Sequence, residues 1–286
     1  MTKVMVLGSS GMLGRTVKEV LRQASFEVVT AGRSDTDTYY FDAEVSDILE
    51  LLGHLNRGDY LVNAIGVITH RIDENDKLQV ALAYRINAQF PLDLAIAAAS
   101  VGVKVIQIAT DCVFSGKVGH YGESSPHDAP DVYGLSKSRG EVQSSAVMHL
   151  RCSIVGPEQG RNLSLLEWVR GQQNGAQIFG FTDHRWNGVT THAFGRVVAG
   201  VVSHNLFNAG VQHLVPKGEV TKAELVRLLA AKAGRADLVV IDKTTGQTLD
   251  RTLATEHPLF NSRLWAAAGY EHIPSIAELI QEMPLN

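Results

Sequence analysis

The chain has 286 residues, of which 45% are apolar and 20% charged, a composition typical of a globular protein with a sizeable core. Its formal net charge of −4 argues against a nucleic-acid or anionic-membrane partner, because both require a concentrated cationic surface. The two cysteines, Cys112 and Cys152, have no disulfide-framework or zinc-site spacing, so no metal is expected. The apolar run at the amino terminus is too short for a signal peptide or a membrane span, and we expect a cytoplasmic protein.

Short β-rich runs alternate with longer helical runs through the first half of the chain, the order that produces a parallel sheet covered on both faces. Almost continuously apolar runs predict strands, buried on both sides, over residues 3–8, 26–32, 59–66, 104–110 and 146–156. Apolar residues spaced three and four apart predict helices over residues 14–24, 46–55 and 78–100. The expected fold is α/β, a Rossmann-like doubly wound parallel sheet.

The first predicted strand leads into Gly8-Ser-Ser-Gly11-Met-Leu-Gly14 and then into a helix. Glycine lets the backbone turn tightly and approach a pyrophosphate, whose charge is held by amides at the helix amino terminus. A plain strand-to-helix turn is the alternative, but the strand before and the helix after favour dinucleotide binding. Cofactor contacts are expected from Gly8, Ser10, Gly11, Met12, Leu13 and Gly14.

The end of the second predicted strand bears on which dinucleotide binds. An NAD site usually has Asp or Glu there to accept hydrogen bonds from the ribose hydroxyls, whereas this strand ends Thr30-Ala-Gly-Arg33. The Arg33 guanidinium suits a 2′-phosphate, so NADPH is the expected cofactor and NADH the alternative; a solvated loop arginine is the other interpretation. Asp42 follows a short third strand, where it is expected either to accept from the adenine amino group or to cap the next helix.

The fourth predicted strand ends in Asn63-Ala64-Ile-Gly66. We expect the backbone to pass close to the nicotinamide ribose here, with the glycine leaving room for the cofactor. A strand that simply ends in a turn is the alternative.

The stretch YGLSK supplies a candidate acid. Reducing a ketone by hydride transfer leaves negative charge on the carbonyl oxygen, so a proton donor and a hydrogen-bond donor must face that oxygen. Tyr133 is the candidate proton donor, and Lys137, one helical turn away, is expected to lower the pKa of the phenol and to hold the nicotinamide ribose. Thr110, at a predicted strand end, is the candidate hydrogen-bond donor. A lone Tyr-x-x-x-Lys is more often a pair on an exposed helix, but its place behind a phosphate loop favours catalysis.

The glycine loop, NAIG, RINAQFPLDLA, ATDCVFSG and VYGLSK, in this order, resemble the extended short-chain dehydrogenase/reductase family, and within it the dTDP-4-dehydrorhamnose reductase-like (RmlD-like) proteins. Those proteins carry a stretch like STDYVFDG, then Tyr-x-Glu, Pro and YGxSKxxGE. This chain has ATDCVFSG, Tyr121-Gly-Glu123, Pro130 and YGLSKSRGE. The resemblance is close over residues 1–155 and loose in the carboxyl-terminal third. It implies that Asn87 holds a water linking Lys137 to a proton relay, and that the substrate is bordered by Asp111, Val113 and Phe114.

The residues after Thr110 narrow the reaction. Related dehydratases have Asp-Glu or Ser-Glu after this threonine, whereas Asp111 and Cys112 follow it here, so the elimination glutamate is missing. The expected reaction is NADPH-dependent reduction of the 4-keto group of a nucleotide-activated 6-deoxy sugar, with a dTDP-linked substrate expected. Two alternatives stay open: an epimerase with tightly held NAD, and a non-catalytic dinucleotide-binding regulatory subunit, like that of methionine adenosyltransferase.

After residue 156 the pattern changes to loops, including residues 179–188, and helices over 191–204 and 221–234. We expect an NADP-binding domain of residues 1–155 plus about 188–210, and a smaller, discontinuous α/β substrate-binding lobe of about 156–187 and 211–286 that closes a cleft above the strand ends.

The substrate candidates of this lobe are Arg185, Trp186, Asn187, Asn162 and Arg161. The alternative is that Trp186 packs between the lobes and Arg185 caps a helix. Members of the resembled family often pair, which suggests a homodimer, but no stripe in the sequence assigns an interface.

Overall fold

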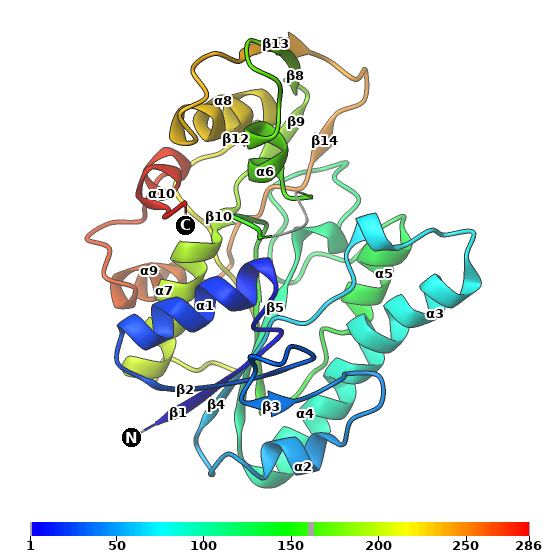
Figure 1. The fold of residues 1–286 in the computed structure, drawn as a ribbon, viewed down its shortest axis with the longest axis vertical. Coiled ribbons are helices and arrows are strands. Elements are labelled where there is room, and N and C mark those ends of the chain that lie inside the picture. Colours follow the sequence, from blue (N-terminus) through cyan, green and yellow to red (C-terminus); the bar gives the residue numbers. More distant parts are fainter. Residues whose placement is uncertain (1, 160–162, 286) are drawn as a thin grey trace.

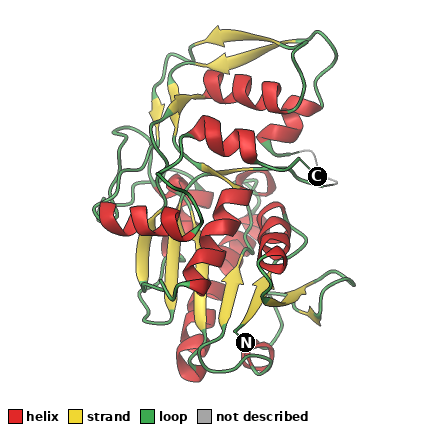
Figure 2. Cartoon of the chain, turned by 90° about the vertical axis from the view of Figure 1, so that its left-hand side faces the viewer, coloured by secondary structure: helices red, strands yellow, loops and turns green. Residues whose placement is uncertain are grey.

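The computed structural model describes residues 2–159 and 163–285. At its centre is a parallel sheet of seven strands in the order β11-β6-β5-β4-β1-β2-β3, with helices on both faces (Figures 1 and 2). The predicted Rossmann-like doubly wound fold is therefore confirmed. The strands are β1 (Lys3–Leu7), β2 (Glu27–Gly32), β3 (Tyr39–Tyr40), β4 (Tyr60–Asn63), β5 (Lys104–Ala109), β6 (Val147–Arg151) and β11 (Gly210–His213).

Side chains along the central strands alternate between two cores. In β1, Val4 and Val6 belong to the core with one helical layer, and Met5 and Leu7 to the core with the other. Burial on both faces explains why these strands are almost continuously apolar. The first layer holds α1 (Met12–Gln23), α7 (Thr191–Ser203) and α9 (Pro258–Ala267), and the second holds α2 (Ile48–Leu52) and α4 (Phe90–Val101).

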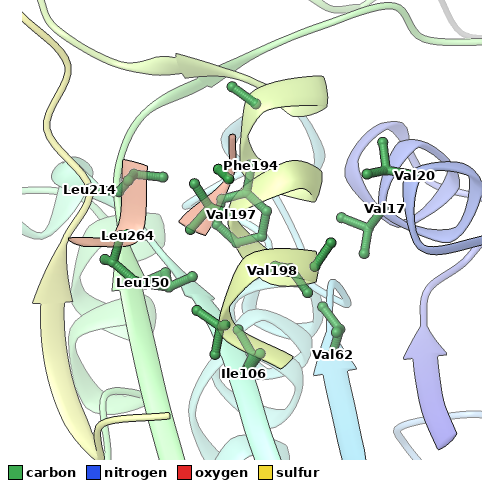
Figure 3. Close-up of a cluster of buried hydrophobic side chains, with 14 of the residues drawn as sticks. Val17, Val20, Val62, Ile106, Leu150, Phe194, Val197, Val198, Leu214 and Leu264 are labelled. Atoms are coloured by element: carbon green, nitrogen blue, oxygen red, sulfur yellow. The ribbon is translucent and has the colours of Figure 1, made fainter. Parts of the chain in front are cut away.

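Helix α7 is the centre of the first core. Figure 3 shows its side chains lying between α1 and the sheet, and none of the labelled side chains is more than 8% exposed. Burying one such side chain stabilises the fold by about 1.5–3 kcal/mol. The labelled residues are Val17, Val20, Val62, Ile106, Leu150, Phe194, Val197, Val198, Leu214 and Leu264.

The predicted helix over residues 78–100 has a π-helical turn in its middle. It consists of α3 (Lys77–Tyr84), the π-helical turn η2 (Arg85–Gln89) and α4, and the turn lies against α5 (Val132–Arg139). Single π-helical turns inside α-helices are frequent at functional sites. Among the described residues, no helix combines the length and the apolar character needed to cross a membrane.

A smaller lobe lies beyond the carboxyl ends of the strands (Figure 1). Its own core joins α6 (Leu165–Arg170), α8 (Lys222–Lys232) and α10 (Ile276–Glu282). Short strands pair beside these helices: β8 (Gln177–Phe181) with β13 (Val239–Lys243), β9 (His184–Trp186) with β12 (Val220–Thr221) and β14 (Leu249–Asp250), and β7 (Ile154–Val155) with β10 (Val189–Thr190). Two 3-10 turns complete the described elements, η1 (Thr69–Arg71) and η3 (Asp111–Val113).

Two predicted elements were wrong in detail. The run over 146–156 is not one strand, because the chain leaves the main sheet after Arg151 and β7 pairs with β10 instead; the amide of Val189 donates to the Ser153 carbonyl oxygen at 2.8 Å at this exit. The segment 179–188 is not a plain loop, because it contains the end of β8 and the whole of β9. The strands that pair with β8 and β9 are distant in sequence, so the local sequence pattern did not predict β8 and β9.

The division of the chain also differs from the expected boundaries. Strand β11 completes the main sheet, and α9 packs on α7, although residues 211–286 were expected in the smaller lobe. Leu264 and Trp265 of α9 belong to the core that covers the sheet. The carboxyl-terminal part of the chain therefore contributes to both halves of the molecule.

Candidate active site

The loop between β1 and α1 has the shape that a pyrophosphate requires. Gly8 has a φ of +73°, and a Cβ atom at Gly14 would lie 2.2 Å from the Gly8 carbonyl oxygen, so both positions require glycine. Helix α1 has Gly11 as its N-cap, and within the described chain no side chain caps it and its first turn holds no acidic residue. Its first N–H groups are thus available to an anion. Ser10 and Gly11 are exposed on this loop, whereas Leu13 is buried in the core below it.

The end of β4 lies beside the glycine loop. Asn63 is paired in register with Leu7, and the amide of Ala64 donates to the Leu7 carbonyl oxygen at 3.1 Å. The buried Asn63 side chain shapes the turn, since its Oδ1 accepts from the Ile65 amide at 3.0 Å and its Nδ2 donates to Gln107. Ala64 and Gly66 follow along the same edge, as an approach of this backbone to a nicotinamide ribose would require.

Arg33 and Asp42 lie together at the far side of β2. Arg33 NH1 is 3.6 Å from Asp42 Oδ2, and the arginine side chain is 63% exposed. Because the guanidinium is exposed, the pair contributes no more than about 1 kcal/mol and Arg33 is free to take another partner. Asp42 does not cap the next helix, because the N-cap of α2 is Asp47. The loop that follows Arg33 places a further carboxylate, Asp37, against the glycine loop, where it accepts a hydrogen bond from the Ser9 hydroxyl.

Thr110 and Tyr133 are brought together by the close packing of α5 on η3. Thr110 follows β5 and caps η3, with its Oγ1 accepting from the Cys112 amide at 3.2 Å. Asp131 caps α5 by accepting from the Gly134 amide at 2.8 Å. A Cβ atom at Gly134 would lie 2.2 Å from the Cys112 carbonyl oxygen, so only glycine lets the two elements approach this closely. The first turn of α5 therefore directs Tyr133 to the end of β5.

The pKa of Tyr133 is raised, not lowered as the sequence suggested. Burial of the phenol is the main cause, and the neighbouring acidic groups Cys112 and Asp111 act in the same direction, while the Thr110 hydroxyl opposes them by stabilising the phenolate. The expected lowering by Lys137 is not found for this phenol, and the ammonium group donates instead to a backbone oxygen. Tyr133 consequently holds its proton firmly at neutral pH.

Lys137 is buried behind Tyr133. Its Nζ donates to the Ile108 carbonyl oxygen at 3.0 Å. Burial lowers the pKa of this ammonium group to about 8, and the negative charge of Glu141 opposes that shift. Lys137 is therefore charged at neutral pH but close to releasing a proton.

Asn87 is buried in the π-helical turn and bridges two segments around Lys137. Its Oδ1 accepts from the Val67 amide at 2.9 Å, and its Nδ2 donates to the Val67 carbonyl oxygen at 2.8 Å and to Ser136 Oγ at 3.1 Å. Both amide protons are thus used inside the protein. A water at this position, as the sequence resemblance implied, would have to bind through the oxygen side of Asn87, and that role stays a prediction.

The substrate side of the site holds two cations that the sequence did not single out, Lys222 and Arg251. Burial raises the pKa of Asp111, and the positive charges of Lys222 and Arg251 oppose that rise. Arg251 Nε donates to the Phe114 carbonyl oxygen at 2.8 Å, and Lys222 Nζ lies 5.6 Å from the centre of the Trp186 ring. Both cations thus lie next to the residues that follow Thr110.

Comparison with known proteins supplies the family. The family model of the RmlD substrate binding domain matches residues 1–268. The chain belongs to this family. The predicted resemblance to RmlD-like reductases is therefore confirmed.

Curated relatives of this RmlD-family chain include reductases of sugar metabolism. A dTDP-4-dehydrorhamnose reductase of Streptomyces griseus is 34% identical over 138 residues, which cover 48% of this chain and 43% of that protein. The spore coat polysaccharide biosynthesis protein SpsK of Bacillus subtilis is 32% identical over 142 residues, covering 49% and 47%. The chain thus spans about half the length of these two relatives. A dTDP-4-keto-6-deoxy-D-glucose reductase of Streptomyces niveus is 26% identical over 98% of this chain and 96% of its own.

Solved structures of similar fold include two dTDP-4-dehydrorhamnose reductases. The enzyme of Clostridium acetobutylicum superposes with a TM-score of 0.76 at 21% identity and covers 99% of this chain and 98% of its own. The enzyme of Bacillus anthracis, solved in complex with NADP, has the same TM-score at 19% identity and the same coverage. At these identities the likeness concerns the fold, which agrees with the seven-stranded sheet described above.

Several residues of this RmlD-family chain that were expected to bind the substrate instead pack or form hydrogen bonds within the protein. Val113 and Phe114 are 0% exposed, and the Phe114 ring stacks on Tyr121 at 4.2 Å, so both side chains pack rather than offering a surface to a substrate. The Asn187 amide is used by the backbone of Leu253, donating to its oxygen at 2.7 Å and accepting from its nitrogen at 2.9 Å. These differences arise because residues 249–256 fold back along the loop after Thr110 and cover it.

The remaining candidates divide in a similar way. Trp186 is buried in the core of the smaller lobe and donates to Ser153 Oγ at 2.8 Å, so its ring packs inside the protein. Arg185 is half-exposed and pairs with Glu219, the residue before β12, so it does not cap a helix. Asn162 and Arg161 lie outside the described residues.

Proposed function

We propose that the chain reduces the 4-keto group of a nucleotide-activated 6-deoxy sugar, with NADPH or NADH as the reductant. The proposal is carried by the protonated Tyr133 beside Thr110 at the end of β5, with Lys137 behind them and an anion-binding glycine loop at the next strand ends. The Streptomyces niveus relative, named as a dTDP-4-keto-6-deoxy-D-glucose reductase, supports the reaction class over nearly the whole chain.

The residues of the site have distinct roles in this reaction. A bound nicotinamide dinucleotide supplies a hydride to the carbonyl carbon. Tyr133 donates its proton to the carbonyl oxygen, and Thr110 turns its hydroxyl from Asp111 Oδ1, 3.2 Å away, to the same oxygen. Lys137 holds α5, and with it the phenol, against the end of β5 through its hydrogen bond to the Ile108 carbonyl oxygen. Together these steps neutralise the alkoxide as it forms.

The residue after Asp111 favours reduction over elimination of water. Burial raises the pKa of the Cys112 thiol to about 12, with the Asp111 charge acting in the same direction. A neutral thiol is a poor base at physiological pH, so Cys112 does not replace the glutamate that dehydratases carry at this position. The arrangement supports a reaction that ends with protonation of the oxygen.

Lys222 and Arg251 give the substrate side a positive charge suited to a sugar nucleotide. Phosphate oxygens bind guanidinium and ammonium groups well, and both cations lie on segments that cover the loop after Thr110. A dTDP-linked sugar is the form we propose, in keeping with the names of the relatives.

The decisive experiment follows the oxidation of reduced nicotinamide by its absorbance when dTDP-4-keto-6-deoxyhexose is added to the protein with NADH or NADPH. Oxidation that needs both sugar and protein supports the proposal, and the product is identified as the 4-hydroxy sugar. No oxidation with this or related keto-sugar nucleotides, despite dinucleotide binding, would favour a regulatory subunit. NAD retained through purification, with sugar interconversion but no net oxidation, would favour an epimerase.

A further inference from the structure

A carboxylate occupies the space that the missing acid at the end of β2 would fill. A Cβ atom at Gly32 would lie 2.6 Å from Oδ2 of Asp37, although Asp37 comes five residues later in the chain. Position 32 is where a dinucleotide site that binds NAD usually carries its Asp or Glu. The glycine thus leaves room for an acid supplied by the following loop.

The carboxylate of Asp37 is held toward the glycine loop. Its Oδ1 accepts a hydrogen bond from the hydroxyl of the buried Ser9, and its Oδ2 accepts from the Ser34 amide at 3.3 Å. Ser9 belongs to the Gly8–Gly11 turn. Asp37 therefore bridges the two strand ends between which an adenine ribose lies in this fold.

The loop that carries Asp37 is fastened to β2. Thr38 Oγ1 accepts from the Thr30 amide at 3.1 Å, and the Thr38 amide donates to Thr30 Oγ1 at 3.0 Å. Directly afterwards Tyr39 pairs with Ala31 at the start of β3. Asp37 lies one residue before Thr38, which makes these two hydrogen bonds. Its position is therefore fixed by β2.

The cation expected to receive a 2′-phosphate points elsewhere. Arg33 is largely exposed and turns to Asp42, which follows β3. A 2′-phosphate placed at the end of β2 would meet the negative charge of Asp37 before the positive charge of Arg33. Ribose hydroxyls, in contrast, donate hydrogen bonds that an ionised carboxylate accepts.

From this arrangement we propose that Asp37 is the residue that selects the cofactor, accepting the ribose hydroxyls of NADH and disfavouring NADPH. The inference rests on the proposed function, which requires a bound dinucleotide. It reverses the preference for NADPH that Gly32 and Arg33 suggest in the sequence. Asp37 acts through its charge and its acceptor oxygens, so asparagine, which keeps its shape, removes the discrimination.

Cofactor binding measured without any sugar tests this inference. The fluorescence of reduced nicotinamide is titrated with the full-length chain, using NADH and NADPH separately. We expect the wild-type chain to bind NADH at least about tenfold more tightly, a difference that one ionic contact is large enough to produce. Asp37→Asn should weaken NADH binding, strengthen NADPH binding, and bring the two dissociation constants within about threefold.

Two controls separate charge at this site from charge in general. Asp35→Asn makes the same change at an exposed position of the same loop and should leave the NADH to NADPH ratio unchanged. Arg33→Ala should weaken NADPH binding in the Asp37→Asn background much more than in the wild-type chain, because Arg33 reaches a 2′-phosphate only when the carboxylate is gone.

The outcomes are distinct from those for the proposed function. Tighter NADPH binding by the wild-type chain, or an unchanged ratio in Asp37→Asn, overturns the selection role even if the reductase is active. If Asp37→Asn does not fold, adenosine 2′,5′-bisphosphate and AMP are compared as competitors of NADH on the wild-type chain, and AMP must be the better competitor. Failure of both dinucleotides to bind overturns the proposed function together with the inference.

Discussion

Lys137 Nζ donates a hydrogen bond to the carbonyl oxygen of Ile108 at 3.0 Å, two residues before Thr110. This bond fastens α5 to the end of β5 from inside the protein. Tyr133 and Thr110, one on each of these elements, are therefore held at a constant separation. The predictions below follow from this arrangement and from the charges around it.

Replacing Tyr133 with phenylalanine removes the proposed acid with little change in shape. We expect kcat for sugar reduction to fall by about 10²–10⁴-fold, the range for loss of a general acid, while NADH or NADPH binding is retained. Stopped-flow turnover and fluorescence titration check the two parts. Tyr40→Phe, which removes a phenol at a 71% exposed position, serves as the control and should be fully active. Turnover that survives in Tyr133→Phe would show that another group protonates the oxygen.

The lowered pKa of Lys137 predicts a pH dependence. The ammonium group loses its proton as the pH rises through about 8, so kcat/KM should decline on the alkaline side of that value. The profile is recorded from about pH 6.5 to 9.5, a range around the titration of the group. Stability gives an independent check. The unfolded chain binds this proton up to a pKa of 10.5, whereas the folded chain releases it near 8, so Lys137 should contribute a rise with pH to the free energy of unfolding across that interval. Burial raises the pKa of the Cys112 thiol, which opposes this rise, so the contribution of Lys137 is measured against a variant that lacks it.

Lys137→Met is the matched variant for both measurements, since it keeps the length of the side chain and removes the amine. The free energy of unfolding of the wild-type chain minus that of this variant should rise with pH across the interval, because the other titrating groups are common to both chains. An alkaline limb near pH 8 that is still present in the residual activity of this variant would assign the titration to another group.

Lys222→Met should weaken substrate binding. The variant removes one of the two cations beside Asp111. We expect KM for the sugar nucleotide to rise by about tenfold while kcat changes less, because a contact with the phosphates is made equally in the ground state and in the transition state. Lys243→Met, at an exposed position of β13, is the matched control and should leave KM unchanged. Equal KM values for Lys222→Met and Lys243→Met would show that Lys222 does not bind the phosphates of the substrate.

The buried ion pair of Arg151 and Glu141 should contribute strongly to the stability of the fold at the carboxyl end of β6. The two groups are 1% and 5% exposed, and the guanidinium also contacts the ring nitrogens of His127 and His213. Arg151→Met leaves the Glu141 carboxylate buried without its partner, so we expect a loss of about 3–5 kcal/mol in the free energy of unfolding. Arg227→Met, which removes an exposed pair with Asp242, should cost no more than about 1 kcal/mol. Urea denaturation of both variants checks the contrast.

The parts of the structure that local pattern specifies were predictable. Continuous apolar runs indicate buried parallel strands, and GxxGxxG between a strand and a helix indicates a phosphate loop. Thr110 was also found, because it ends a predicted strand, and Tyr133 was found from the Tyr-x-x-x-Lys spacing in YGLSK.

The rest depends on contacts between distant segments. Lys222 and Arg251 reach the loop after Thr110 only because the smaller lobe folds back over it. The raised pKa of Tyr133 depends mainly on how deeply the phenol is buried, which spacing does not give. Predictions of a homodimer and of a cytoplasmic location concern surroundings that one chain does not contain, and they stay predictions.

Strand β11 forms one edge of the seven-stranded sheet and pairs with β6. In the chain, the two strands are separated by several elements, including β8, β9 and α6 of the smaller lobe. During synthesis, the edge of β6 therefore has no neighbour until that intervening chain has left the ribosome. Unpaired strand edges bind other chains readily, so this interval is when the nascent protein is most prone to aggregate. A chain cut after β7 would keep that edge permanently open, and the amino-terminal half should be insoluble when expressed without the rest.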